Sequence, residues 1–317
     1  MSQDLTVAVF PVAGLGTRLL PATKAIPKEV LAVVDKPLIQ YAVDEALEAG
    51  FTELVFVTAR GKTPLEDYFD TNPGLDATLQ RGGKTALLDA IAPIARCGER
   101  ISYIRQQEAL GLGHAVLCAR QLVGRRPFAV ILPDDLILSQ TPCLAQMREA
   151  HARHGGSVLA TMEVAPEAVS SYGILDVARA DGPLLELRGM VEKPSPEAAP
   201  SRQAVIGRYI LAPEVMENLR SQGPGAGGEI QLTDAIARQM AQNPGSVRGL
   251  CFEGQRFDCG SKAGLMQAAV AVALEHPEIG TDFRAYLEAC LRAPARPRKA
   301  GHDHPQSAPS PARSAVA

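Results

Sequence analysis

A loop near the start of the chain carries residue types that bind phosphate. The apolar stretch Leu5–Phe10 is predicted to be a strand, and it runs directly into a loop that contains Gly14 and Gly16. Glycines let the backbone approach a phosphate chain closely and point its N–H groups at it. Arg18 adds a planar charged fork to this loop and Lys28 adds a point charge. The loop is therefore expected to bind a polyanion.

Two common phosphate-binding patterns do not match this loop. The dinucleotide pattern G-x-G-x-x-G fails because Leu19 stands at its third glycine and Pro21 follows soon after. The P-loop pattern fails because no Gly-Lys-Ser/Thr ends the run. A structural turn would explain a bare G-x-G, but the additional Thr17, Arg18 and Lys28 make the longer pattern much more specific.

Carboxylates follow another predicted strand, Phe128–Leu132. Asp134 and Asp135 come directly after it, and Asp258 lies in a predicted turn before a helix. Carboxylate oxygens bind hard cations such as Mg²⁺, which also takes phosphate oxygens as ligands. An isolated Asp-Asp pair is more often a helix cap or a solvated turn. The metal interpretation therefore depends on the phosphate loop in the same predicted sheet.

Polar residues also follow two further predicted strands. Gln106 comes after Ile101–Arg105, and its amide offers both a donor and acceptors of hydrogen bonds. Glu192 can accept hydrogen bonds from hydroxyl groups, and Lys193 can hold an anionic group. Each of these has an ordinary alternative, which is surface polarity for the glutamine and a solvated ion pair for the glutamate and lysine.

Taken together, these motifs resemble the nucleotide sugar pyrophosphorylases, whose signature is G-x-G-T-R-x-x-P-x-T followed by P-K. The form with Ala13 before Gly14 and with Pro27-Lys28-Glu29 is similar to the bacterial UTP–glucose-1-phosphate uridylyltransferases of that family. The resemblance runs in order from about residue 5 to residue 290. It departs at Val30 and Ala32, where the family usually has Met and Pro, and this change bears on loop rigidity more than on chemistry.

The resemblance implies roles for individual residues. The nucleotide is expected to contact Ala13, Gly14, Gly16, Thr17, Glu29, Gln106 and Gly111. The sugar phosphate is expected to contact Gly173, Glu192 and Lys193. Arg18, Lys28 and Lys193 supply catalytic charge, and Asp134 and Asp258 bind Mg²⁺. Two questions remain open, namely whether Asp135 joins the metal and what the family-like run Gly228–Ala235 does.

The implied reaction transfers UMP from UTP to alpha-D-glucose 1-phosphate and gives UDP-glucose and pyrophosphate. Such a step depends on positioning and on neutralising phosphate charge. One alternative is a thymidylyltransferase that uses dTTP, a group that usually has Gly at the position of Ala13 and Gln at that of Glu29. The other is a non-catalytic UDP-sugar-binding protein, which the intact lysines and aspartates do not favour.

Helical and strand-like segments alternate along most of the chain. Strands are predicted at 5–10, 53–58, 101–105 and 128–132, and helices at 37–49, 64–69, 84–95, 113–122, 232–242, 263–275 and 281–291. The pattern predicts an α/β fold with a Rossmann-like mixed, mostly parallel sheet flanked by helices. Three further strands, at 173–177, 184–191 and 203–211, are expected to form a smaller β-rich sugar-binding annex. The resemblance implies the nucleotide-diphospho-sugar transferase fold.

The domain prediction is a single nucleotidyltransferase domain over residues 1–293. Its nucleotide-binding part covers about 1–165, and the annex with the closing helices covers about 166–293. Residues 294–317 are rich in Pro, Ala and Ser and are predicted to be disordered, because they cannot bury enough apolar surface to order themselves.

Composition limits the remaining possibilities. The 317 residues are 46% hydrophobic without an apolar stretch long enough to span a bilayer, so no membrane partner is expected. A net charge of −3 argues against nucleic acid as a partner. Six cysteines without a C-x-x-C pair favour a cytoplasmic location and make a zinc site improbable. The apolar helix around Phe283–Leu291, together with the resemblance, predicts a homo-dimer or homo-tetramer.

Overall fold

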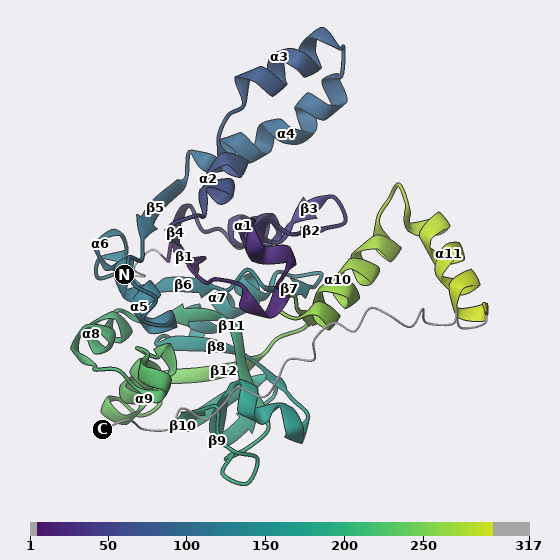
Figure 1. Cartoon of the computed structure of the whole chain (residues 1–317). Coiled ribbons are helices and arrows are strands. Elements are labelled where there is room, and N and C mark those ends of the chain that lie inside the picture. The colour runs from purple at the N-terminus through teal and green to yellow at the C-terminus, as the bar shows by residue number, and fades with distance from the viewer. Residues whose placement is uncertain (1–4, 294–317) are drawn as a thin grey trace, which may run out of the picture. The chain divides into compact units, whose positions relative to one another are not determined.

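A single nine-stranded sheet forms the centre of the structure, a computed structural model that describes residues 5–293 (Figure 1). The strand order is β5-β4-β1-β6-β11-β8-β12-β10-β9. In that order the strands are Ile101–Arg105, Glu53–Thr58, Val7–Pro11, Phe128–Ile131, Gln203–Leu211, Ser157–Glu163, Val247–Cys251, Leu184–Glu192 and Gly173–Asp181. The α/β fold with a mixed sheet is therefore confirmed, but the prediction that the sheet is mostly parallel is wrong, because four of its eight neighbouring strand pairs are parallel and four are antiparallel.

Strands β5, β4, β1 and β6 are mutually parallel. Successive residues of β1 enter two different cores, with Ala8 and Phe10 on one face of the sheet and Val7 and Val9 on the other. A parallel strand buried on both faces reads as a continuous apolar run, which is why this strand could be predicted. The carboxyl ends of these strands share one edge of the sheet, where ligands bind in open α/β folds.

Helices cover both faces of the sheet, as predicted. The described residues form helices α1 Leu38–Glu48, α2 Thr63–Phe69, α3 Pro73–Arg81, α4 Thr85–Gly98, α5 Leu112–Cys118, α6 Arg120–Val123, α7 Cys143–His154, α8 Pro213–Ser221, α9 Leu232–Gln242, α10 Lys262–Glu275 and α11 Gly280–Arg292. Ile39 of α1 and Leu144 of α7 lie in the core on one face. Val116 of α5, Val215 of α8 and Ile236 of α9 lie in the core on the other face.

The sequence predicted that strand β11 belongs to the annex, and this prediction is wrong. Strand β11 lies at the centre of the main sheet. It pairs antiparallel with β6 and with β8. The β-rich edge consists of β9 and β10, which pair antiparallel with each other, and β10 continues the main sheet through β12. The partners of β11 lie far from it in the sequence, so its apolar run alone could not place it.

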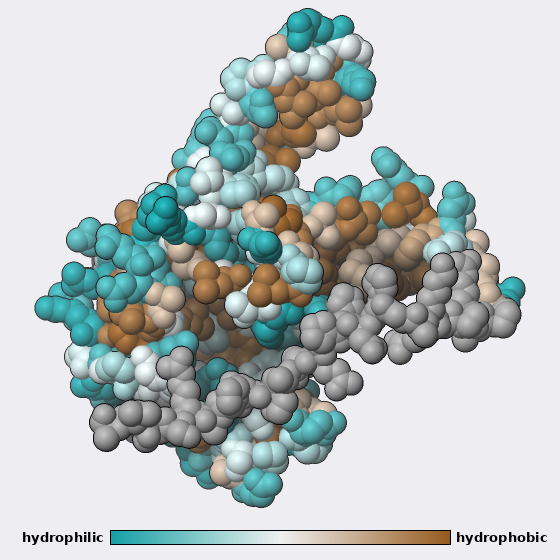
Figure 2. Space-filling model, in the orientation of Figure 1, coloured by the Kyte–Doolittle hydropathy of each residue, from teal (hydrophilic) through white to brown (hydrophobic). Residues whose placement is uncertain are grey.

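Several elements were not predicted from the sequence. Helices α3, α7 and α8, strands β8 and β12, and the small ribbon of β7 (Asp135–Leu138) with β13 (Gln255–Asp258) are new. Helix α3 has no buried residue, and Asn72 Oδ1 caps it by accepting a hydrogen bond from the N–H of Leu75 at 3.1 Å. Helices α3 and α4 form an arm along which hydrophobic side chains gather (Figure 2).

Of the described residues, those at 273–293 belong to a second compact unit. Helix α11 lies within it, and the rings of Phe283 and Tyr286 stack there with centroids 6.5 Å apart. The predicted disordered tail, 294–317, lies outside the described residues. Within residues 5–293, no helix is both long enough and apolar enough to cross a membrane.

Candidate active site

Asp134 and Asp258 lie beside each other at the edge where the parallel strands end. Asp134 follows β6 and Asp258 ends β13, and the N–H of Cys259 donates to the carbonyl of Asp134 at 2.7 Å. The guanidinium of Arg18 lies 3.6 Å from Asp134 Oδ2 and 3.4 Å from Asp258 Oδ2. The structure therefore brings together three of the residues that the sequence had placed at the metal and phosphate site.

The space between these carboxylates suits a hard cation. A Cβ added at Gly260 would lie 2.8 Å from Asp134 Oδ2 and 3.0 Å from Asp258 Oδ1, so only glycine leaves this cradle open. Within residues 5–293, no group of three or more His, Cys, Asp or Glu side chains is placed to hold a metal ion. Two carboxylates fit a cation such as Mg²⁺ that completes its shell with water and phosphate oxygens.

Lys28 forms the shortest contact of this cluster. It begins a 3-10 turn, Lys28–Val30, and its Nζ lies 2.6 Å from Asp134 Oδ2. Burial lowers the pKa of Lys28, but the charges of Asp134 and Glu29 outweigh burial and leave the pKa raised. Burial raises the pKa of Asp134, but the charges of Lys28 and Arg18 leave it below its usual value. Both partners are therefore charged at neutral pH.

The loop Gly14–Arg18 is mostly exposed at the end of β1, and Ala13 before it is partly buried. Gly16 has a φ of +66°, and its carbonyl accepts a hydrogen bond from the Thr23 hydroxyl at 2.8 Å. A left-handed residue at this point turns the backbone sharply, which glycine does without strain. The loop, including Thr17, is thus open to solvent, and binding of a phosphate chain there stays a prediction.

Gln106 and Gly111 also meet at this edge of the sheet. Gln106 Nε2 donates to the carbonyl of Gly111 at 3.1 Å and lies 3.0 Å from Nδ1 of His114, the acceptor in one ring tautomer. These two bonds use both amide hydrogens, so Oε1 is the atom left to accept a hydrogen bond from a base. Gly111 has a φ of +100°, and a Cβ there would lie 2.7 Å from Glu229 Cβ.

Glu29 is only 1% exposed and is paired with a residue that the sequence analysis missed. Lys62 Nζ lies 2.8 Å from Glu29 Oε2, and Oε1 has no hydrogen-bond partner among the described residues. Burial raises the pKa of Glu29, and the charges of Lys62 and Lys28 oppose this rise without cancelling it. Lys62 follows β4 at the same edge as the other site residues, and this position is the signal that would have identified it.

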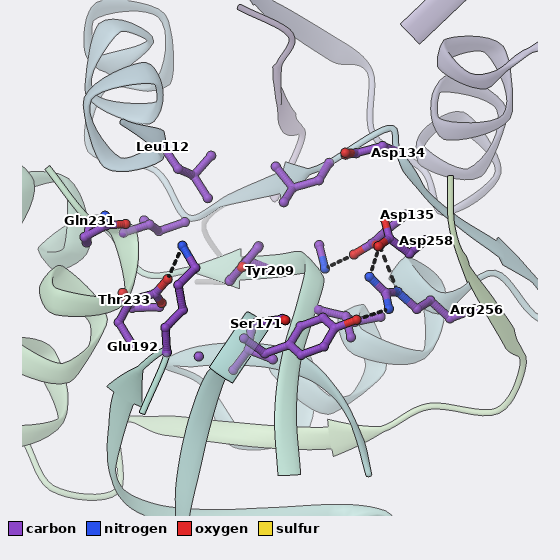
Figure 3. A pocket seen from close by; sticks show the side chains of 18 of the residues that line it. Leu112, Asp134, Asp135, Ser171, Glu192, Tyr209, Gln231, Thr233, Arg256 and Asp258 are labelled. Carbon is purple, nitrogen blue, oxygen red and sulfur yellow. Dashed lines mark hydrogen bonds and ion pairs between the residues drawn. The ribbon is translucent and has the colours of Figure 1, made fainter. Parts of the chain in front are cut away.

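A pocket of about 330 Å³ joins the metal side to the predicted sugar side (Figure 3). Arg18, Asp134 and Asp258 line it, together with Gly173, Glu192 and Lys193. Lys193 Nζ lies 3.2 Å from Glu192 Oε1. Of the described residues, eight predicted ones lie outside its lining: Ala13, Gly14, Gly16, Thr17, Lys28, Glu29, Gln106 and Gly111.

The run Gly228–Ala235 connects the two ends of the site. The N–H of Gly113 donates to the carbonyl of Ile230 at 2.8 Å, and the N–H of Ile230 donates to Leu110 at 2.8 Å. Gln231 and Thr233 then line the pocket beside Glu192 (Figure 3). This segment therefore pairs with the loop beside Gln106 and also contributes to the sugar side.

Asp135, the neighbour of Asp134, is bonded to residues of β11 and β13. Its Oδ2 accepts the N–H of Gly207 at 2.6 Å, and its Oδ1 accepts Nε of Arg256 at 2.8 Å and also bonds Nη2 of Arg256. Both oxygens are thus engaged within the protein. These bonds favour a structural role for Asp135 over metal binding, the question that the sequence left open.

Arg208 supports the loop that carries Asp134. It is 1% exposed, its Nη2 lies 2.7 Å from Glu45 Oε2, and its Nη1 donates to the carbonyl of Leu132 at 3.0 Å. Its two neighbours in β11, Gly207 and Tyr209, differ from it in position. The structure shows that Gly207 and Tyr209 line the pocket and that Arg208 is buried beneath it.

Comparison with known proteins settles the family. A model of the nucleotidyl transferase family matches residues 8–274. The chain belongs to this family. The resemblance to its UTP–glucose-1-phosphate uridylyltransferases is confirmed by relatives that carry that name. One, from Bacillus subtilis (strain 168), is 46% identical over 292 residues, 92% of this chain and 97% of the relative. Another, from Komagataeibacter xylinus, is 49% identical over 262 residues, 83% of this chain and 92% of the relative.

Solved structures agree with these relatives. A UDP-glucose pyrophosphorylase complexed with UDP-glucose has a TM-score of 0.78 and 44% identity, covering 86% of this chain and 100% of its own. A UTP-bound UGPase from Acinetobacter baumannii has a TM-score of 0.80 and 42% identity, covering 90% of this chain and 99% of its own. The fold predicted from the resemblance is therefore confirmed. Nucleotidyl transferases generally use a divalent metal, which agrees with the paired aspartates.

Proposed function

We propose that this chain transfers UMP from UTP to alpha-D-glucose 1-phosphate and forms UDP-glucose and pyrophosphate. The observation that carries the proposal is the pocket in which Asp134, Asp258 and Arg18 share one lining with Glu192 and Lys193. Carboxylates and a guanidinium at one end suit a cation with a triphosphate, and the pair at the other end suits a sugar phosphate. The relatives named for this reaction support the same activity.

The triphosphate lies over the loop Gly14–Arg18, and Lys193 holds the phosphate of glucose 1-phosphate. An oxygen of that phosphate attacks the α-phosphorus of UTP in line and forms the new P–O bond. The bond to the bridging oxygen of the β-phosphate breaks, and pyrophosphate leaves with its electron pair. No general base is required because the attacking phosphate is already ionised, so positioning and charge neutralisation dominate.

Arg18 and Lys28 stabilise the charge that develops on the leaving pyrophosphate and at the α-phosphate. Asp134 and Asp258 would hold Mg²⁺, which when bound neutralises phosphate charge and orients the two anions that otherwise repel. Glu192 orients the sugar by accepting hydrogen bonds from its hydroxyls. Gly173 has no side chain and so leaves room for the sugar beside Thr233.

Selection of the base is proposed to depend on Gln106, whose Oε1 accepts the imide N–H of uracil while Nε2 stays bonded to Gly111. The resemblance adds Ala13, Gly111 and Glu29 as base contacts. Thymine shares the imide edge of uracil, so discrimination against dTTP has to come from the space around its methyl group and from the ribose. Ala13 and Glu29 favour uridine because the thymidylyltransferases usually differ at both positions.

We also propose that residues 1–293 form a single domain and that the chain assembles into a homo-dimer or homo-tetramer. Its proposed location is the cytoplasm. Light scattering on the purified chain measures the assembly directly, because a monomer, a dimer and a tetramer differ in mass by whole multiples.

The deciding experiment measures pyrophosphate release by the purified chain with Mg²⁺ and glucose 1-phosphate, with UTP, dTTP, ATP and GTP tested in parallel. A strong preference for UTP is expected. A preference for dTTP would overturn the roles given to Ala13 and Glu29 while leaving the metal site intact. Absence of release with all four nucleotides would refute the catalytic proposal and favour the sugar-binding alternative.

A further inference from the structure

Arg256 of β13 bonds to Asp135 at the start of β7. Its Nε and Nη2 both donate to the Asp135 carboxylate. Arg256 lies two residues before Asp258, and Asp135 directly follows Asp134. The side chains of Arg256 and Asp135 are each 9% exposed. A guanidinium that donates two bonds to one carboxylate has a fixed orientation. Its remaining nitrogen, Nη1, therefore points in a direction set by the metal side of the site.

That nitrogen reaches the sugar side of the pocket. Arg256 Nη1 donates to the hydroxyl of Tyr172 at 2.9 Å, and its guanidinium carbon lies 5.3 Å from the centroid of the Tyr172 ring. The ring contact and the hydrogen bond restrain the aromatic side chain from two directions. Both residues line the pocket, and the bonds of Arg256 are drawn as dashed lines in Figure 3.

Tyr172 in turn forms a hydrogen bond with the backbone of Lys193, the residue predicted to bind the sugar phosphate. The carbonyl of Tyr172 accepts the N–H of Lys193 at 3.0 Å, and Tyr172 directly precedes Gly173. Lys193 has a φ of +44°, a left-handed conformation that side chains other than glycine rarely adopt. Such a conformation persists only where the surrounding structure imposes it. The bond from Tyr172 is one of those restraints.

We propose that Tyr172 and Arg256 are positioning residues. They set the distance between the residues that bind the sugar phosphate and the aspartates that bind the metal. The inference rests on the proposed function. The chain of contacts runs from Lys193 through Tyr172 and Arg256 to Asp135, beside Asp134. In a reaction between two anions, a displacement of about 1 Å between the reacting groups reduces the rate by about 100-fold. The hydroxyl of Tyr172 is the link that can be removed while Lys193 and the aspartates keep their own side chains.

The test compares the wild type with Tyr172→Phe, which keeps the ring and the backbone carbonyl and loses only the hydroxyl. Calorimetry measures the affinity of each for UDP and for UDP-glucose. The ratio of the two affinities is expected to fall about tenfold in the variant, as for loss of a hydrogen bond to a charged donor. Affinity for UDP itself is expected to stay unchanged. In turnover, KM for glucose 1-phosphate should rise and KM for UTP should not.

Tyr41→Phe is the matched control. The Tyr41 hydroxyl likewise takes part in one hydrogen bond of 2.9 Å, which it donates to the carbonyl of Val33, and Tyr41 does not line the pocket. A general loss of stability would act alike in both variants, whereas a positioning role changes only Tyr172→Phe. A second variant, Arg256→Lys, keeps a positive charge beside Asp135 but loses the fork, and it should show the same selective loss.

The outcomes separate this inference from the proposed function. A wild-type chain that releases no pyrophosphate overturns the proposed function and this inference with it. An active wild type, with a Tyr172→Phe variant whose ratio of UDP-glucose to UDP affinity matches that of Tyr41→Phe, overturns this inference alone.

Discussion

Lys28 Nζ lies 2.6 Å from Asp134 Oδ2. The Lys28 amine thus binds a carboxylate oxygen of Asp134, a residue that is proposed to hold the divalent cation. Arg18 lies against the same carboxylate and against Asp258. A divalent cation held by Asp134 and Asp258 would neutralise Asp134 in place of Lys28, and the Lys28 amine would then be free to bind phosphate. Lys28 and Arg18 therefore place two positive charges beside the position from which pyrophosphate is proposed to leave.

Lys28→Met should reduce kcat by about 10²–10³-fold, the usual loss when one charged group that stabilises a transition state is removed. Lys24→Met is the control, because Lys24 lies in the same loop but is exposed. Steady-state kinetics with UTP and glucose 1-phosphate measure both variants. Equal activity of the two would contradict the role given to Lys28.

Asp134→Ala should abolish metal-dependent turnover, and chelation of divalent metal should do the same to the wild type. A second readout is the binding of Mn²⁺ in the presence of UTP, followed by electron paramagnetic resonance, which should weaken strongly in the variant. Asp44→Ala, an exchange in α1 away from the pocket, serves as the control. Full activity of Asp134→Ala at limiting Mg²⁺ would refute the metal assignment.

Lys193→Ala should raise KM for glucose 1-phosphate far more than KM for UTP, because the amine is assigned to the sugar phosphate. Comparison with Lys193→Gly separates the amine from the backbone. At a φ of +44°, glycine is unstrained and alanine is not, so the glycine variant should be more stable by about 1 kcal/mol. Thermal unfolding measures this difference. Equal KM values for glucose 1-phosphate in the wild type and both variants would count against the assignment.

Arg208→Met should destabilise the protein by about 3–5 kcal/mol, because it leaves Glu45 as a buried charge without its partner. The double variant Arg208→Met with Glu45→Leu should recover much of this loss, since a buried ion pair is often replaceable by apolar side chains. Denaturant unfolding measures both. If the double variant loses as much as the sum of the two single variants, the two residues are not coupled.

Glu53 provides a pH-dependent contribution to stability. The hydrogen bonds from Arg126 lower the pKa of Glu53, the bond from Thr6 adds to this, and desolvation opposes it only in part. Because the folded pKa lies below the unfolded one, this stabilisation is present above the unfolded pKa of about 4.3 and is lost as pH falls through the folded pKa. Glu53→Gln should therefore cost about 0.2–1 kcal/mol at pH 7, as for an exposed ion pair, and almost nothing near pH 2. A difference that does not depend on pH would contradict this account.

Much of the site was predictable because its chemistry is local in the sequence. Contact with a phosphate chain requires glycines and fixed positive charge within one loop, and Gly14, Gly16 and Arg18 supply both over a few residues. Asp134 follows an apolar strand buried on both faces, a pattern that identifies the strand without knowledge of its neighbours. The parallel half of the sheet and the family resemblance were accessible for the same reason.

The tertiary structure alone decided the residues whose roles depend on distant partners. Asp135 stands next to Asp134, yet its bonds to Arg256 and Gly207 turn it into a structural residue. Lys62 and Arg208 are buried only because Glu29 and Glu45 neutralise them across the fold. Strand β11 is central because its partners are β6 and β8, an outcome that its own apolar pattern does not encode. Local sequence determines which side chains are present at each strand end, whereas long-range pairing determines which of them face the ligand.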